Sequence, residues 1–137
     1  MKKILISIIF TILITTSVYC SDSYKCVVKE TYTISEQGIW EQKENKNLNL
    51  TGKEFVVNRT TGYISGPLRL KNYTFDVKPK VLHKGSNENS LKVITIDTNG
   101  SIVYVQYLYV QSFNTTKEKP FYFVDGNWSY CGTCFEF

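Results

Sequence analysis

The chain has 137 residues, of which 42% are hydrophobic and 20% charged, and its formal net charge is +4 at pH 7. This length suits one domain rather than two, and so small a positive charge is not the clustered basic footprint of a nucleic-acid-binding protein. We therefore expect a single small domain with no nucleic-acid partner.

The first residues have the pattern of an export signal. Lys2 and Lys3 precede a mostly apolar run, residues 4–14, and polar residues then lead to a cleavage position after Cys20. The run is shorter than the roughly 20 apolar residues that a membrane-spanning helix needs. We predict that residues 1–20 are a signal peptide, that the protein is periplasmic or secreted, and that no stable membrane span remains after cleavage. A lipoprotein acylated at Cys20 and an uncleaved anchor are the two alternatives.

Cleavage leaves residues 21–137 as one domain, and it lowers the formal net charge from +4 to +2 because it removes two lysines and no acid. This domain is rich in Val, Ile, Thr, Tyr and Phe, which favour strands. Residues 59–62 and the Asn99-Gly100 pair are typical of tight hairpin turns. In chain order the expected strands are residues 24–34, 39–41, 54–58, 63–65, 73–78, 91–97, 101–112, 121–124 and 128–131.

These short segments with hairpin connections predict an all-β fold, namely a single small antiparallel β-barrel or sandwich of about eight strands. The longest segment, residues 101–112, alternates between two apolar sides. One side holds Ile102, Tyr104, Leu108 and Val110 together with Gln106, and the other holds Val103, Val105, Tyr107 and Tyr109. A strand that is apolar on both sides is predicted to be central or buried between layers.

Three cysteines remain after cleavage: Cys26, Cys131 and Cys134. The residues alone leave three pairings open. A catalytic Cys131–Cys134 dithiol is disfavoured, because such motifs usually open a helix. A zinc site is disfavoured too, since it needs about four ligands and the cleaved chain offers only three scattered cysteines and one histidine. A structural disulfide from Cys26 to Cys131 or Cys134 is the favoured interpretation.

No catalytic arrangement can be recognised in the sequence. His83 is the single histidine, so any Ser-His-Asp or Cys-His mechanism would have to use it, and no Gly-x-Ser-x-Gly elbow is present. We predict that the protein is not an enzyme and that it needs no cofactor and no metal.

Aromatic residues gather in the last third of the chain. Most are expected in the core, as in other small β domains. Three lie next to predicted loops and are our candidates for an exposed binding patch: Phe113, Phe121 and Trp128. The expected partner is an unknown envelope protein or a small ligand.

Several motifs together resemble a family of small exported proteins of Gram-negative bacteria that has no assigned biochemical function. The motifs are Tyr24-Lys25-Cys26, residues 55–62, Lys119-Pro120-Phe121 and Gly132-Thr133-Cys134. The resemblance implies a disulfide between Cys26 and Cys134. Cys131 departs from the family pattern, in which a small polar residue is usual.

A looser resemblance is to the small β-barrel inhibitors of c-type lysozyme, which also begin with a Tyr-x-Cys strand. Their Ser-Gly-x-x-Tyr inhibitory loop is not reproduced, because Arg69 stands where the tyrosine is expected after Ser65-Gly66. We expect an exported envelope protein that acts as a non-enzymatic binding or interaction module. The alternative is an inhibitor of a hydrolase such as c-type lysozyme.

Overall fold

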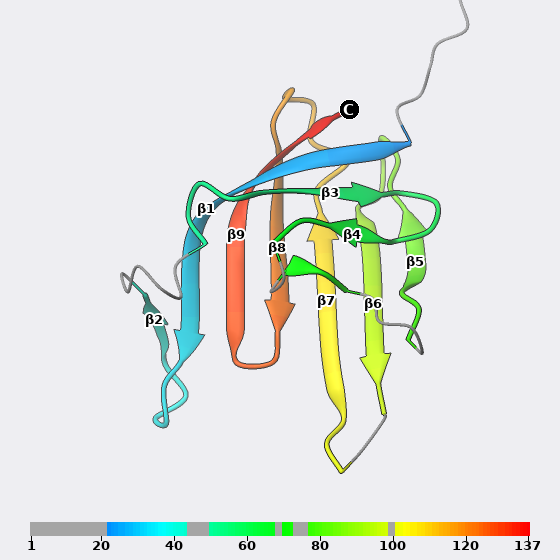
Figure 1. The fold of residues 1–137 in the computed structure, drawn as a ribbon. Helices are drawn as coiled ribbons and strands as arrows, with labels where there is room; N and C mark the ends of the chain where they lie inside the picture. Colours follow the sequence, from blue (N-terminus) through cyan, green and yellow to red (C-terminus); the bar gives the residue numbers. More distant parts are fainter. Residues whose placement is uncertain (1–21, 44–49, 68–69, 73–76, 99–100) are drawn as a thin grey trace, which may run out of the picture.

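The computed structural model describes residues 22–43, 50–67, 70–72, 77–98 and 101–137. Their strands form a single antiparallel sheet that curls into a half-barrel (Figure 1), so the predicted all-β antiparallel fold is confirmed. Among these residues no helix has the length and apolar character needed to cross a membrane. The strands are β1 (Ser23–Ile34), β2 (Trp40–Gln42), β3 (Glu54–Asn58), β4 (Ile64–Ser65), β5 (Lys80–Lys84), β6 (Leu91–Asp97), β7 (Tyr104–Val110), β8 (Lys119–Asp125) and β9 (Trp128–Glu136).

The strand order places the first and last strands side by side. Across the sheet the order is β4-β3-β1-β9-β8-β7-β6-β5, and β2 pairs with the second half of β1. From β5 to β9 each strand pairs with the next one along the chain, as in a meander. β1 pairs with β9 from Tyr24, opposite Glu136, to Thr33, opposite Trp128. The meander is thereby joined to the β1–β3–β4 part in one sheet.

β1 bends where its register against β9 shifts, between Val28 and Glu30. Before the bend β1 pairs with β3 and after it with β2, and Figure 1 shows β3 and β4 crossing in front of the meander. Gly132 of β9 lies opposite Val28, and a Cβ atom on it would stand 2.0 Å from the carbonyl oxygen of Val27. Only glycine fits here, because β9 must approach the bent strand closely.

The concave side of the sheet holds the hydrophobic core. Its residues come from alternate positions of the strands, because successive side chains of a strand point to opposite sides. They include Tyr24, Cys26, Val28, Phe55, Val57, Leu91, Val93, Leu108, Val110, Phe121, Phe123, Tyr130 and Cys134. Cys26 and Cys134 face each other in the register of β1 and β9 and form a disulfide bond inside this core. The pairing that the family resemblance implies is confirmed, and Cys131 is a free cysteine.

One arginine connects the two ends of the half-barrel. Arg59, in the turn after β3, donates from Nε to the carbonyl of Lys84 and from Nη2 to the carbonyl of Gly85, at 3.1 Å in both cases. Its guanidinium carbon also lies 5.1 Å from the centre of the Tyr24 ring, in a cation–π contact. The β3–β4 hairpin is thereby held against the far edge of the sheet at β5.

The predicted strand boundaries agree well at β1, β3 and β6, and the turn at residues 59–62 joins β3 to β4 as expected. β7 is shorter than the predicted segment 101–112, because it begins at Tyr104 and leaves Ile102 and Val103 in front of it, 77% and 65% exposed. On its concave side Gln106, Leu108 and Val110 are buried as predicted, whereas Tyr104 is 43% exposed. Of the two alternatives expected for this strand, a central position is confirmed, since β6 and β8 pair with it on either side, whereas its other side is not buried between layers.

β5 has no counterpart among the expected strands. Its residues Lys80, His83 and Lys84 are polar and follow Pro79, so the segment has little of the strand-like composition used for the prediction. Residues 73–76 of another expected strand, and the Asn99-Gly100 turn, lie outside the described residues.

Candidate functional site

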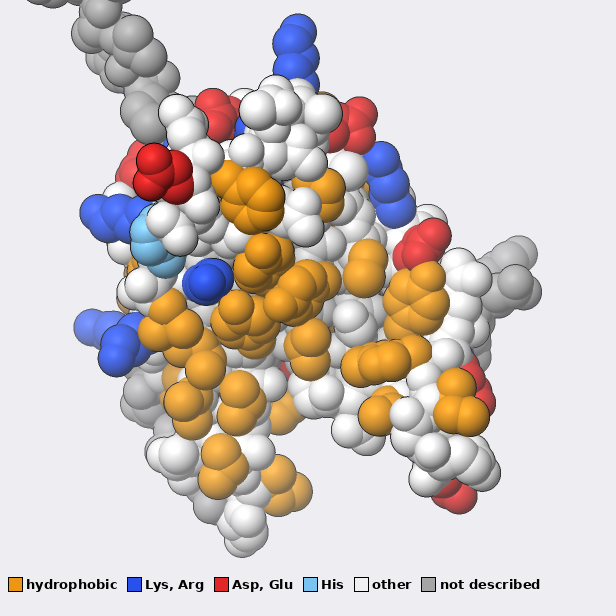
Figure 2. All heavy atoms as spheres, turned by 180° about the vertical axis from the view of Figure 1, so that it is seen from behind, with side chains coloured by type: hydrophobic (Ala, Val, Ile, Leu, Met, Phe, Trp, Pro, Cys, Tyr) orange, Lys and Arg blue, Asp and Glu red, His pale blue; other side chains and the backbone are white. Residues whose placement is uncertain are grey.

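The convex side of the sheet carries an apolar surface over β6, β7 and β8. Residues of these strands that alternate with the core residues point outward. Several remain well exposed, namely Ile96 at 50%, Val105 at 42% and Tyr122 at 38%. Figure 2 shows hydrophobic side chains gathered over this part of the sheet. We call the surface the tyrosine face and define it as Ile94, Ile96, Val105, Tyr107, Tyr109, Tyr122 and Val124.

Three tyrosines pack against one another in the middle of the tyrosine face. Tyr109 lies directly opposite Tyr122 in the pairing of β7 and β8, and the two rings stack with 4.9 Å between centroids and 17° between planes. The centroid of the Tyr107 ring lies 5.9 Å from that of Tyr122. Such pairs contribute about 0.5–1.5 kcal/mol each beyond the area they bury. The cluster is thus ordered in the free protein, which reduces the entropy lost when a partner binds.

Tyr107 stays uncharged at neutral pH. Burial raises the pKa of its phenol above the ordinary value of 10.0, and the neighbouring Tyr122 and Tyr109 raise it further. The hydroxyl is therefore protonated and can donate or accept a hydrogen bond. An aromatic surface rich in tyrosine and poor in charge has the composition that the centres of protein–protein interfaces favour.

Opposite charges stand at the two ends of a row that crosses this surface. The register of five neighbouring strands places one outward residue of each strand in line. Glu30 ends the row on β1, where its carboxylate accepts a hydrogen bond from the Tyr32 hydroxyl. Lys92 ends it on β6, and none of the ion pairs among the described residues includes Lys92. The whole row is Lys92, Tyr109, Tyr122, Cys131 and Glu30.

Cys131 lies on the convex side opposite Tyr122, whereas Cys134 lies in the core. Residues three apart in a strand point to opposite sides, so the two sulfurs of this Cys-x-x-Cys sequence cannot bond to each other within β9. The structure therefore excludes the Cys131–Cys134 dithiol that the sequence left open.

The Cys131 thiol is also a poor nucleophile. Burial raises its pKa above the ordinary value of 9.0, and the Glu30 carboxylate raises it further, while a hydrogen bond with Ser129 acts in the opposite direction. A raised pKa keeps the thiol protonated at neutral pH, and the thiolate is the reactive form.

Histidine, cysteine and acidic residues form no metal-holding group in the described part of the chain. His83 lies near the end of β5, where its Nδ1 accepts a hydrogen bond from the Gly85 amide at 3.0 Å. Within the described ranges no three His, Cys, Asp or Glu side chains are grouped so that they could hold a metal ion. His83 thus has a local structural role at the strand end.

The binding patch expected from the sequence is not a continuous surface. Phe113 is 42% exposed in the connection between β7 and β8, but Phe121 is only 4% exposed and packs edge to face on Phe55 in the core. Trp128 is half-buried against the same core. The prediction that Phe121 is exposed is wrong, because its position in β8 points it to the concave side whatever loop lies nearby. The opposite alternation, at Tyr107, Tyr109 and Tyr122, was the signal that could have found the tyrosine face.

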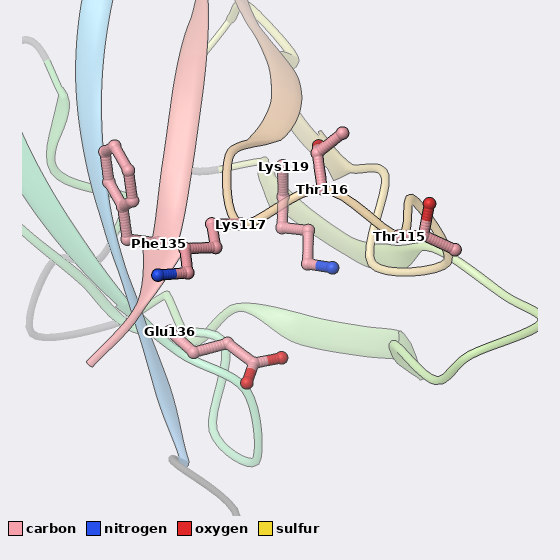
Figure 3. A pocket seen from close by; sticks show the side chains of 6 residues that line it. All are labelled: Thr115, Thr116, Lys117, Lys119, Phe135 and Glu136. Carbon is pink, nitrogen blue, oxygen red and sulfur yellow. The ribbon is translucent and has the colours of Figure 1, made fainter.

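A shallow basin of about 370 Å³ lies between the β7–β8 connection and the end of β9 (Figure 3). The Lys119 ammonium is engaged there, because it donates a hydrogen bond to the Asn114 carbonyl. The other lining residues are Thr115, Thr116, Lys117, Phe135 and Glu136, all exposed. Small-ligand sites usually enclose their ligand and aim a few buried polar groups at it, and this basin does neither.

Comparisons with protein-family models, with curated proteins and with solved structures find no match to this chain. The resemblance to small exported proteins therefore rests on the motifs quoted above.

Proposed function

We propose that this protein is an exported, non-enzymatic interaction module that binds another protein through the tyrosine face. The observation that carries the proposal is the ordered aromatic cluster on the middle strands of the sheet, in which Tyr122 is exposed and Tyr107 and Tyr109 are half-buried.

Physical chemistry favours a protein as the partner rather than a small ligand. Removing apolar surface from water contributes about 25 cal/mol per Å², so a broad face of tyrosine, isoleucine and valine gains most from a partner that covers it widely. A small molecule needs a concave site to bury most of its surface, and the tyrosine face lies on the convex side of the sheet.

Two observations support an exported protein. Disulfide bonds persist in oxidising compartments, and Cys26 and Cys134 form one. Residues 1–20 have the charge and apolar pattern of an export signal. We therefore propose that the interaction takes place in the periplasm or outside the cell.

Capture from an envelope extract tests this function. The mature protein is immobilised as wild type, as Tyr109→Ser/Tyr122→Ser and as Phe113→Ser, and the retained proteins are identified by mass spectrometry. Phe113 is a matched control because its exposure, 42%, is close to the 38% of Tyr122, while it lies outside the tyrosine face. We expect a protein that wild type and Phe113→Ser retain and that the tyrosine variant loses, with the circular dichroism of all three unchanged.

The opposite pattern, loss with Phe113→Ser alone, would place the binding surface at the β7–β8 connection and contradict the proposal. An inhibitor of a hydrolase would be one instance of the same class of function. The activity of c-type lysozyme, measured with and without the mature protein, tests that instance directly.

A further inference from the structure

We infer that the protein bound by the tyrosine face is a second copy of this chain, packed face to face around a two-fold axis that runs parallel to β8. The inference rests on the proposed function, in which this face is a protein interface. It is carried by the self-complementary order of charges and side-chain sizes across the sheet.

A two-fold axis between two facing sheets fixes which strands meet. Packed sheets lie about 10 Å apart, and an isologous dimer uses the same surface of both copies. When the axis is parallel to β8, the order of strands in the second copy is reversed. β6 of one copy then faces β1 of the other, β7 faces β9, and β8 faces β8.

This arrangement pairs opposite charges. In the row that crosses the tyrosine face, Lys92 and Glu30 each lie two strands from β8, on opposite sides of it. Lys92 of each copy therefore stands opposite Glu30 of the other, and the symmetry produces two such pairs. Both are long side chains, which suits the wider gap at the margins of two convex surfaces.

The same arrangement sets large side chains against small ones. Tyr109 and Cys131 lie on either side of β8 in the first row, and Tyr107 and Ser129 in the next row, where Val124 lies on β8 itself. Tyr109 and Tyr107 of one copy therefore face Cys131 and Ser129 of the other, while Tyr122, on β8, faces its own counterpart across the axis. Interdigitation of this kind is what close packing between two sheets requires.

Neighbouring axes lack this complementarity. An axis along β7 would place Tyr109 against itself, as the β8 axis places Tyr122, but it would set Lys92 against Tyr122. An axis along β9 would place Cys131 against itself and Tyr122 against Glu30. Neither pairs Lys92 with a carboxylate, so the charges select β8.

Charge reversal tests the inference on the oxidised mature protein. Sedimentation velocity over a range of concentrations should give a two-chain mass for wild type. Lys92→Glu and Glu30→Lys should each weaken self-association at least about tenfold, because each variant sets two like-charged pairs in the interface. An equimolar mixture of the two variants should recover the two-chain species, since every contact then joins one Glu to one Lys. Lys53→Glu and Glu88→Lys, exposed and outside the tyrosine face, are controls with the same change of net charge.

Several outcomes would overturn the inference. The inference is wrong if the wild-type protein is monomeric at every concentration. In that case the capture experiment still tests the proposed function. Tyrosine-dependent capture of a different protein would leave the function standing, whereas its absence would remove both. A dimer that ignores both charge reversals, or a mixture that stays monomeric, rejects the β8 axis.

Cys131 provides a second readout that needs no substitution. With the axis at β8 the two Cys131 residues are two strand spacings apart, about 9–10 Å, and on sheets about 10 Å apart. Their Cα atoms thus exceed the roughly 7 Å limit for a disulfide. Mild oxidation should therefore give no dimer linked through Cys131. A linked dimer, found by non-reducing electrophoresis and peptide mapping, would refute this face-to-face arrangement.

Discussion

Replacing Cys26 and Cys134 together by alanine should lower the free energy of unfolding by about 4–5 kcal/mol. The disulfide joins residues 108 positions apart. In the chain-entropy treatment, a loop of that length restricts the unfolded chain by about 4.8 kcal/mol at 25 °C. A small domain is stable by only about 5–15 kcal/mol, so this one bond holds a large share of its stability.

Urea unfolding followed by circular dichroism measures this loss. The double alanine variant and its parent both carry Cys131→Ser, so that no thiol exchange occurs. The free energy of unfolding falls by about 1–3 kcal/mol per M of urea, so the midpoint of unfolding should fall by at least about 1.5 M. Cys131→Ser alone should change the free energy of unfolding by less than about 1 kcal/mol, because this thiol is half-buried and forms no disulfide. An alanine variant as stable as its parent would refute the reasoning, and an equally large loss from Cys131→Ser would assign the bond to the wrong cysteine.

Three further predictions concern single residues. Gly132→Ala should destabilise the fold by at least about 2 kcal/mol in urea unfolding, because its Cβ would meet the Val27 carbonyl at 2.0 Å. Gly38→Asn, at a positive φ with open space around it, should lower the free energy of unfolding by less than about 1 kcal/mol. Equal losses from the two variants would contradict the close approach of β9 to β1 at Gly132. Arg59→Ala should lower the free energy of unfolding by about 2 kcal/mol or more, since it removes two charged hydrogen bonds and the cation–π contact. An unchanged midpoint of urea unfolding would show that these contacts do not stabilise the hairpin. Iodoacetamide should alkylate Cys131 more slowly in the folded protein than in urea, and the rate should go on rising with pH beyond 9.0, where that of an ordinary thiol begins to level off, because the pKa of this thiol is raised. Fast alkylation of the folded protein at pH 7 would contradict the raised pKa.

Local sequence signals were sufficient for much of the fold. The alternation in residues 24–34 and the turn at residues 59–62 correspond to β1 and to the β3–β4 hairpin. The sides of β7 also follow from alternation, since Gln106, Leu108 and Val110 are buried together. The disulfide partner of Cys134 did not follow from spacing alone, because Cys26 could pair with either terminal cysteine, and it was the family resemblance that implied the pairing.

The candidate site was harder to predict, because periodicity tells which residues share a side of a strand and not whether another layer covers that side. The segment with Tyr107 and Tyr109 was expected to be central or buried between layers; β7 is central, and the two tyrosines lie half-buried on its convex side. Phe121 was chosen for its closeness to a loop, although its strand position directs it into the core. The alignment of Lys92 with Glu30 depends on pairing among five strands, and no stretch of the sequence contains that information.

Hydroxyl-radical footprinting at increasing protein concentration tests the tyrosine face most directly, because radicals oxidise exposed tyrosine and phenylalanine alike. Tyr122 and Phe113 start with similar exposure, 38% and 42%, on different surfaces of the same molecule. We predict that oxidation of Tyr109 and Tyr122 falls as the concentration rises, while oxidation of Phe113 stays constant. Tyrosines that remain as reactive as Phe113 at every concentration would contradict a face that a second copy covers.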